Sequence, residues 1–236
     1  MKEERHEGLL ESICMWKFIQ GLFEEGVPRR LPYMEGKGML SDAIVKHVLD
    51  GFPVVYPTYN LPALGCIPTS DALDQLYELK QRSHDMKVSL AVADIEQAAD
   101  IVNIHPNVIR LISDFKPGSI TTILPSLKTM DERLGGDEIA IRVIDTPVSQ
   151  ELLRKVGPLT ATSANLSGKK PEKDCKKAAA SLGLDFVITS NCTGGPPSTL
   201  IRCDDYAGLN SGEQIQVLRE GIVSEVEVKA WLKKMT

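Results

Sequence analysis

Near the start of the chain, apolar residues recur at the spacing of one helix face. The positions are Leu9, Ile13, Trp16, Ile19 and Phe23. A glycine and a proline follow this run, so the pattern predicts an amphipathic helix over roughly residues 8–25. The polar, proline-containing stretch 27–38 is typical of a connector. We therefore place a domain boundary between a helical extension, residues 1–37, and a main domain, residues 38–236.

The main domain alternates segments of helical period with short apolar runs typical of buried strands. The predicted helices are 41–50, 70–80, one from 94, 106–115, 147–156, 172–182 and one from 224. The predicted strands are 53–56, 88–93, 119–124, 138–144, 159–161, 186–189, 199–203 and 214–218. Some neighbouring strands have no helix between them, which indicates a mixed sheet. The expected fold class is α/β, with helices flanking that sheet.

The composition of the chain restricts which binding partners and which cellular location we expect. The chain has 236 residues, 42% of them hydrophobic, and a formal net charge of −5. This charge gives no general attraction to nucleic acid or anionic membrane, so an RNA contact needs a local basic patch. No apolar run approaches the ~18 residues of a membrane span, and the acidic N-terminus is unlike a signal peptide. The five scattered cysteines form no C-x-x-C pair, which favours reduced thiols and a cytoplasmic location.

Candidate chemistry gathers where strand 159–161 runs into the small polar segment 162–168, Thr-Ser-Ala-Asn-Leu-Ser-Gly. By itself such a segment is a common turn. A polyphosphate, however, requires several fixed cations together with neutral hydrogen-bond donors at strand ends. The chain offers such groups in Lys80, Arg82, Arg142, Ser163, Asn165, Ser198 and Arg219. Together they predict a triphosphate pocket.

Each cation also has an explanation that needs no ligand. Lys80 and Arg82 follow a helix, whose C-terminus favours cations. Arg142 lies in a strand whose apolar and polar residues alternate, a pattern that is also explained if Arg142 simply faces solvent. Arg219 fits a surface ion pair of little energetic weight. The chain lacks a P-loop, a G-x-G-x-x-G turn and a G-x-S-x-G elbow. His84, the histidine nearest these residues, is interpreted as a solvated loop residue.

The arrangement of these segments resembles the YrdC/Sua5 family of threonylcarbamoyl-AMP synthases. The resemblance covers about residues 38–223. It rests on seven motifs in order: Val54-Val55-Tyr56-Pro57-Thr58; Lys80-x-Arg82; Lys116-Pro117-Gly118 with Thr121-Thr122-Ile123-Leu124; Ile141-Arg142-Val143; Thr162 to Gly168; Pro197-Ser198-Thr199; and Leu218-Arg219-x-Gly221. It implies a YrdC-like twisted mixed sheet with a large concave basic cavity.

The same resemblance implies a nucleotidyl transfer that uses ATP, L-threonine and bicarbonate. The threonine amine adds to bicarbonate, and the resulting carbamate attacks the α-phosphate of ATP and expels pyrophosphate. The product, L-threonylcarbamoyl-AMP, supplies the N6-threonylcarbamoyladenosine (t6A) modification of tRNA. Mg²⁺ is expected with the triphosphate rather than at a protein-only metal site. RNA, including double-stranded RNA, and tRNA-modification proteins are the implied macromolecular partners.

Residue roles follow from the resemblance, motif by motif. The implied catalytic residues are Lys80 and Arg82. The implied ATP-binding residues are Lys80, Arg82, Arg142, Ser163, Asn165, Ser198 and Arg219. The implied amino-acid-binding residues are Thr58, Asn60, Arg82 and Thr162.

The chain departs from the family pattern on the amino-acid side. Asn60 and Pro62 stand where the family usually has a threonine and a tyrosine. Losing a tyrosine hydroxyl removes a hydrogen bond on which polar discrimination depends. Met86 stands where the family commonly has a lysine or asparagine and supplies no charge. Two alternatives therefore stay open: a non-catalytic or altered-substrate nucleotide- or RNA-binding protein, and an accessory protein whose N-terminal helix docks on a partner rather than on its own domain.

Overall fold

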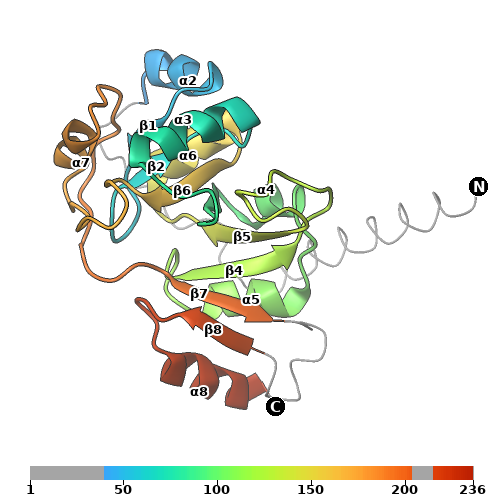
Figure 1. Cartoon of the computed structure of the whole chain (residues 1–236). Helices are drawn as coiled ribbons and strands as arrows, with labels where there is room; N and C mark the ends of the chain where they lie inside the picture. The colour runs from blue at the N-terminus through green and yellow to red at the C-terminus, as the bar shows by residue number, and fades with distance from the viewer. Residues whose placement is uncertain (1–39, 204–214, 236) are drawn as a thin grey trace, which may run out of the picture. The chain divides into compact units, whose positions relative to one another are not determined.

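A computed structural model describes residues 40–203 and 215–235 of the chain. The predicted N-terminal helix and connector, residues 1–37, lie outside the described residues. The described strands form one eight-stranded sheet in the order β1-β2-β6-β3-β5-β4-β7-β8 (Figure 1). The pairs β3–β5 and β4–β7 are parallel, whereas the other neighbours are antiparallel. The predicted α/β class with a mixed sheet is confirmed.

The strands are short and the helices connect or flank them. The strands are β1 (Val54–Tyr56), β2 (Ala63–Gly65), β3 (Ser89–Val92), β4 (Ile120–Pro125), β5 (Glu138–Val143), β6 (Leu159–Ser163), β7 (Thr199–Cys203) and β8 (Ile215–Arg219). The described helices are α2 (Asp42–Leu49), α3 (Ser70–Lys80), α4 (Ile95–Ala99), α5 (Pro106–Asp114), α6 (Pro147–Val156), α7 (Cys175–Ser181) and α8 (Glu225–Met235).

Local signals in the sequence set several helix ends. The Ser41 hydroxyl accepts a hydrogen bond from the Ile44 amide at the start of α2, and the Asp94 carboxylate caps α4 in the same way. Prolines open α5 and α6, where a missing amide hydrogen costs nothing. At the end of α3, Gln81 adopts a left-handed conformation with φ 48°. The left-handed residue ends the helix, and Arg82 begins the loop that follows.

The two faces of the sheet differ because side chains alternate along each strand. One face packs against α3, α4, α5, α7 and α8, and its buried strand residues include Leu90, Val92, Ile139, Ile141 and Ile201. The other face packs against α2 and α6, and its buried strand residues include Val54, Tyr56, Ala91 and Leu159. Near β4, β5, β7 and β8 the second face instead lines a cavity.

Two sequence predictions need correction at the β1 edge of the sheet. The predicted strand 186–189 is only a single parallel bridge between Val187 and Val55. The Val55 amide donates to the Phe186 carbonyl at 3.3 Å and the Ile188 amide donates to the Val55 carbonyl at 2.8 Å, so the segment pairs with β1 at a single residue. The Phe186 ring stacks on His47 of α2 with centroids 3.8 Å apart. Strand β2 was not predicted, because three residues that follow a proline carry no readable alternation. In addition, α7 begins at Cys175 rather than at residue 172.

Candidate active site

The cavity on the second face of the sheet has a volume of about 420 Å³. This size is typical of small-molecule sites. Side chains from β2, β3, β4, β5, β6, β7 and β8 contribute to its lining. Seven of the ten predicted site residues line it: Asn60, Arg82, Arg142, Thr162, Ser163, Ser198 and Arg219. Residues from segments that are far apart in the sequence therefore line one cavity.

Arg142 lies on β5 and is 7% exposed, so it does not face bulk solvent. Its Nε donates to the Gly118 carbonyl at 2.8 Å, and its Nη2 donates to Asn60 Oδ1 at 2.8 Å. Burial lowers the pKa of Arg142, and the nearby Arg219 charge lowers it further. The pKa still lies far above neutrality, so the guanidinium carries its charge into the cavity lining.

Arg219 and Ser198 meet at the β7–β8 side of the cavity. Arg219 Nη2 donates to the Ser198 carbonyl at 2.9 Å, while the Ser198 hydroxyl lies 2.7 Å from the hydroxyl of Thr121 on β4. Burial lowers the pKa of Arg219, and the positive charge of Arg82 lowers it further. The arginines therefore lie close enough to disfavour one another's charge. An anion placed among them would relieve that repulsion.

Lys80 is placed beside the cavity rather than in its lining. It is the last residue of α3, and its side chain is 1% exposed. Its Nζ donates to the carbonyls of Ser163 and Asn165 at 2.5 and 2.6 Å. Burial, with the Arg82 charge as a second cause, lowers the pKa of Lys80 to about 8. The amine thus braces the turn after β6, and its predicted contact with phosphate stays a prediction.

The turn after β6 also holds a buried side-chain oxygen, on Asn165, that accepts no hydrogen bond from the described part of the chain. Asn165 is 8% exposed, and its Nδ2 donates to the carbonyls of Leu166 and Lys169 at 2.7 Å. Asn165 Oδ1 is buried and has no hydrogen-bond partner among the described residues. Buried acceptors are rarely left unpaired, so this oxygen is available for a donor that the protein does not supply.

Arg82 shapes the loop that bounds the cavity on the α3 side. Its Nε donates to the Met86 carbonyl at 2.8 Å and its Nη2 to the Lys87 carbonyl at 2.9 Å. The Tyr77 hydroxyl also donates to the Met86 carbonyl, at 2.7 Å. His84, in the same loop, is exposed, as expected. Met86 and Lys87 both line the cavity, and Met86 is 50% exposed.

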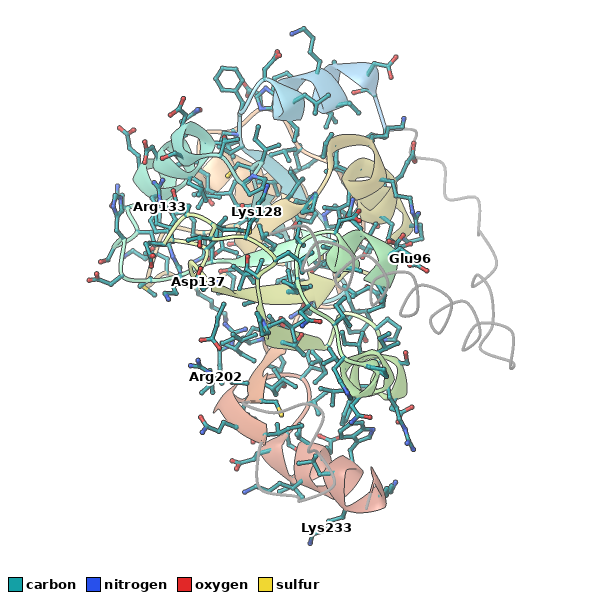
Figure 2. All side chains as sticks on the ribbon, turned by 90° about the vertical axis from the view of Figure 1, so that its right-hand side faces the viewer. Glu96, Lys128, Arg133, Asp137, Arg202 and Lys233 are labelled. Carbon is teal, nitrogen blue, oxygen red and sulfur yellow. The ribbon has the colours of Figure 1, made fainter. Side chains whose placement is uncertain are left out.

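Arg133 supports this loop from behind and was not predicted from the sequence. It is labelled in Figure 2 and pairs with Asp74 and with Asp131, the latter at 2.7 Å. The Arg133 carbonyl accepts from the Val88 amide at 2.9 Å. Thr121 is a second residue that the sequence reasoning missed, although its motif was recognised. The Arg133–Asp74 pair and the Thr121–Ser198 contact join residues 59 and 77 positions apart, and a local pattern cannot reveal such pairs.

The Tyr-Pro-Thr loop between β1 and β2 is largely buried, and its threonine bonds within the loop. Thr58 is 1% exposed and donates to the Leu61 carbonyl at 2.7 Å. Thr58 therefore shapes the loop and does not line the cavity. Pro62 does line it, and apolar groups surround that end: Leu61, Ala63, Met86, Val88 and Leu134.

Within the part of the chain that the structure describes, the lining of the cavity includes no cysteine and a single carboxylate. The described residues contain no group of three or more His, Cys, Asp or Glu side chains placed to hold a metal. Glu138, the carboxylate in the cavity lining, pairs with Arg202 on β7. Among the described residues, Cys66, Cys175, Cys192 and Cys203 are free. Burial raises the pKa of the Cys66 thiol to about 12, which makes it a poor nucleophile.

None of the helices within residues 40–203 and 215–235 is long and apolar enough to cross a membrane.

Comparisons with known proteins place the chain among recognised relatives. A threonylcarbamoyl-AMP synthase of Vibrio parahaemolyticus is 30% identical over 188 residues, which cover 76% of this chain and 98% of the relative. The crystal structure of E. coli YciO has a TM-score of 0.65 at 28% identity, covering 78% of this chain and 90% of that one.

A second solved structure agrees in fold. The crystal structure of P. abyssi Sua5 complexed with L-threonine has a TM-score of 0.69 at 23% identity, covering 80% of this chain. The match spans 56% of the length of that protein. The model of the Sua5/YciO/YrdC family, which carries the description "Telomere recombination", matches residues 46–221. The chain therefore belongs to the Sua5/YciO/YrdC family.

Proposed function

We propose that this protein forms L-threonylcarbamoyl-AMP and pyrophosphate from ATP, L-threonine and bicarbonate, as the first step of tRNA t6A modification. One observation carries the proposal: Arg82, Arg142 and Arg219 converge on one cavity whose lining also holds the hydroxyls of Thr162, Ser163 and Ser198. The names of the curated relatives, such as the Vibrio parahaemolyticus synthase, support the same activity.

The arginines suit the polyphosphate of ATP. Fixed guanidinium groups bind phosphate oxygens in pairs and keep their charge in a partly buried site. Burial and, as a second cause, the positive charge of Arg82 lower the pKa of Arg219, and an anion bound between the arginines would offset both effects. Ser198, joined to Arg219 and Thr121, adds a hydroxyl at the same end.

The turn after β6 suits the remainder of the nucleotide. Thr162 and Ser163 line the cavity, and Asn165 holds an unpaired acceptor beside it. Lys80 fixes the carbonyls of this turn from behind. We assign nucleotide contacts to Ser163 and Asn165, and we assign to Lys80 the role of holding them in place.

Catalysis then rests on positioning and charge neutralisation. The threonine amine displaces water from bicarbonate and gives a carbamate. A carbamate oxygen forms a bond to the α-phosphorus of ATP while the bond to the bridging oxygen breaks, and pyrophosphate leaves with that electron pair. Holding these reactants in line removes much of the entropic barrier, and fixed arginines stabilise the charge on the phosphoryl oxygens.

Metal, amino-acid and partner assignments complete the proposal. Mg²⁺ enters with the triphosphate as part of the substrate, since the cavity's carboxylate is already paired with Arg202. Arg82 and Thr162 line the cavity and are proposed to face the amino acid. We place the reaction in the cytoplasm and propose tRNA-modification proteins or RNA as partners.

The apolar amino-acid end favours a second candidate. Pro62 and Met86 line the cavity where the family pattern has polar groups. A protein that binds ATP without turning over threonine, or that takes a different amino acid, would retain the arginines and lose those contacts.

Pyrophosphate release distinguishes the two. The purified chain is expected to release pyrophosphate from ATP only when threonine and bicarbonate are both present. Omitting either one provides the control, and the other amino acids test for an altered substrate. ATP binding without pyrophosphate release in any mixture would favour the non-catalytic candidate.

A further inference from the structure

Asn60 lines the cavity and its side-chain amide joins two separate segments of the chain. It is 1% exposed and lies in the loop between β1 and β2. Its Oδ1 accepts from Arg142 Nη2 at 2.8 Å, and its Nδ2 donates to the Pro196 carbonyl at 2.6 Å. If the Asn60 amide were flipped, its Nδ2 would face the Arg142 guanidinium and its Oδ1 would face the Pro196 carbonyl, and neither pair could form a hydrogen bond. These two partners therefore fix the orientation of the amide.

The main chain around Asn60 reinforces this connection. The Asn60 carbonyl accepts from the Gly194 amide at 2.8 Å, and the Tyr59 carbonyl accepts from the Thr193 amide at 3.0 Å. The segment 193–196 is thereby joined along its length to the β1–β2 loop. It leads directly to Ser198, which lines the cavity.

Arg142 depends on Asn60 for its orientation. The guanidinium is held at Nε by the Gly118 carbonyl and at Nη2 by Asn60. Neither of these two contacts uses Nη1, and the side chain lines the cavity. A planar guanidinium fixed at two of its nitrogens has a fixed plane, so the third nitrogen is presented in a defined direction.

From these contacts we infer that Asn60 is a positioning residue for the polyphosphate end of the site and is not a ligand of the amino acid. The inference rests on the proposed function. It reassigns a residue that the family resemblance places on the amino-acid side. The amide provides an acceptor and a donor on separate atoms, whereas the hydroxyl of the threonine usual at this position has one oxygen to serve both Arg142 and Pro196.

A double-mutant cycle with ATP binding as the readout tests the inference. Asn60→Ala is expected to weaken ATP binding, measured by calorimetry, by about tenfold or more, because it releases a hydrogen bond to a charged group. Arg142→Ala should weaken it at least as much. In the Arg142→Ala background, Asn60→Ala should cost clearly less ATP affinity than it does in the wild type, because the contact with Arg142 is already lost and only the hydrogen bond to the Pro196 carbonyl remains to be broken on the cavity side. The KM for threonine should stay unchanged in Asn60→Ala.

Thr193→Val serves as the matched control. The Thr193 hydroxyl donates to the Tyr59 carbonyl at 3.1 Å, so its loss loosens the same loop without touching Arg142. ATP affinity in this variant should remain within about twofold of the wild type. Asn60→Ser, which keeps a short polar side chain in the buried position, takes the place of Asn60→Ala if alanine lowers the unfolding temperature.

The outcomes separate this inference from the proposed function. If the wild-type chain does not bind ATP, the proposed function is wrong and the inference fails with it. If the wild type binds ATP and Asn60→Ala binds it equally well, only the inference is overturned. Additive losses in the double mutant, or a raised KM for threonine with unchanged ATP affinity, would also overturn it.

Discussion

Replacing Lys80 with alanine is expected to lower kcat/KM for ATP by about tenfold to a hundredfold, the effect of losing about 1.5–3 kcal/mol from hydrogen bonds to a charged group. The Lys80 amine donates to the carbonyls of both Ser163 and Asn165 and does not line the cavity. Its loss would remove one of the two donors of the Ser163 carbonyl, leave the buried Asn165 carbonyl without its lysine donor, and free the turn that presents Ser163. Steady-state kinetics with ATP varied at saturating threonine and bicarbonate measures the effect.

Lys155→Ala is the matched control for loss of a lysine charge. Lys155 lies on α6, pairs with Glu151 at 3.2 Å and is 43% exposed, so its replacement should change stability by less than about 0.5 kcal/mol and leave kinetics unchanged. A folded Lys80→Ala protein with the kcat/KM of the wild type would contradict the role given to Lys80.

Replacing Gly221 with alanine is expected to destabilise the protein by about 1–3 kcal/mol and to weaken ATP binding at the same time. A Cβ at this position would lie 2.2 Å from the Pro197 carbonyl oxygen and 2.6 Å from the Ser198 carbonyl carbon. Backbone atoms cannot rotate away as a flexible side chain can. The segment carrying Ser198 would have to move, and the contact between Ser198 and Arg219 would move with it.

Urea unfolding and ATP calorimetry together test this prediction, with Gly183→Ala as the comparison. Gly183 has φ +68° and nothing within 4 Å of its ideal Cβ, so alanine there tests backbone strain without a clash. It should destabilise the protein yet leave ATP affinity unchanged. Equal ATP affinities in the Gly221→Ala and wild-type proteins would show that the close approach does not position Ser198.

Elements with explicit start and stop signals were the ones that the sequence could predict. The helices 70–80 and 147–156 and the strand 199–203 have the predicted bounds. Pro147 and Gly157 mark the two ends of one of these helices. Strand β2 lacked such signals, since its three residues gain their extended form from pairing with β1 and β6.

The charged residues of the site could be predicted from the sequence, but the separate role of each residue could not. The types of these residues predicted a shared triphosphate pocket and the resemblance to a family implied the same, but the spacing of Arg82, Arg142 and Arg219 along the chain does not show how they converge. The bracing role of Lys80 depends on the carbonyls of Ser163 and Asn165 on another element, more than eighty residues away. The Asn60–Pro196 hydrogen bond likewise joins residues 136 positions apart. Long-range hydrogen bonds of this kind leave no periodicity in a sequence.

Isotope incorporation into the product is the most direct test of the central claim that this cavity joins threonine, bicarbonate and ATP. The purified chain is incubated with ATP, L-threonine and ¹³C-labelled bicarbonate, and the nucleotides are analysed by mass spectrometry. The account predicts threonylcarbamoyl-AMP that carries the label, with pyrophosphate formed in equal amount. AMP and pyrophosphate without a labelled conjugate, or no turnover by a chain that binds ATP, would contradict it.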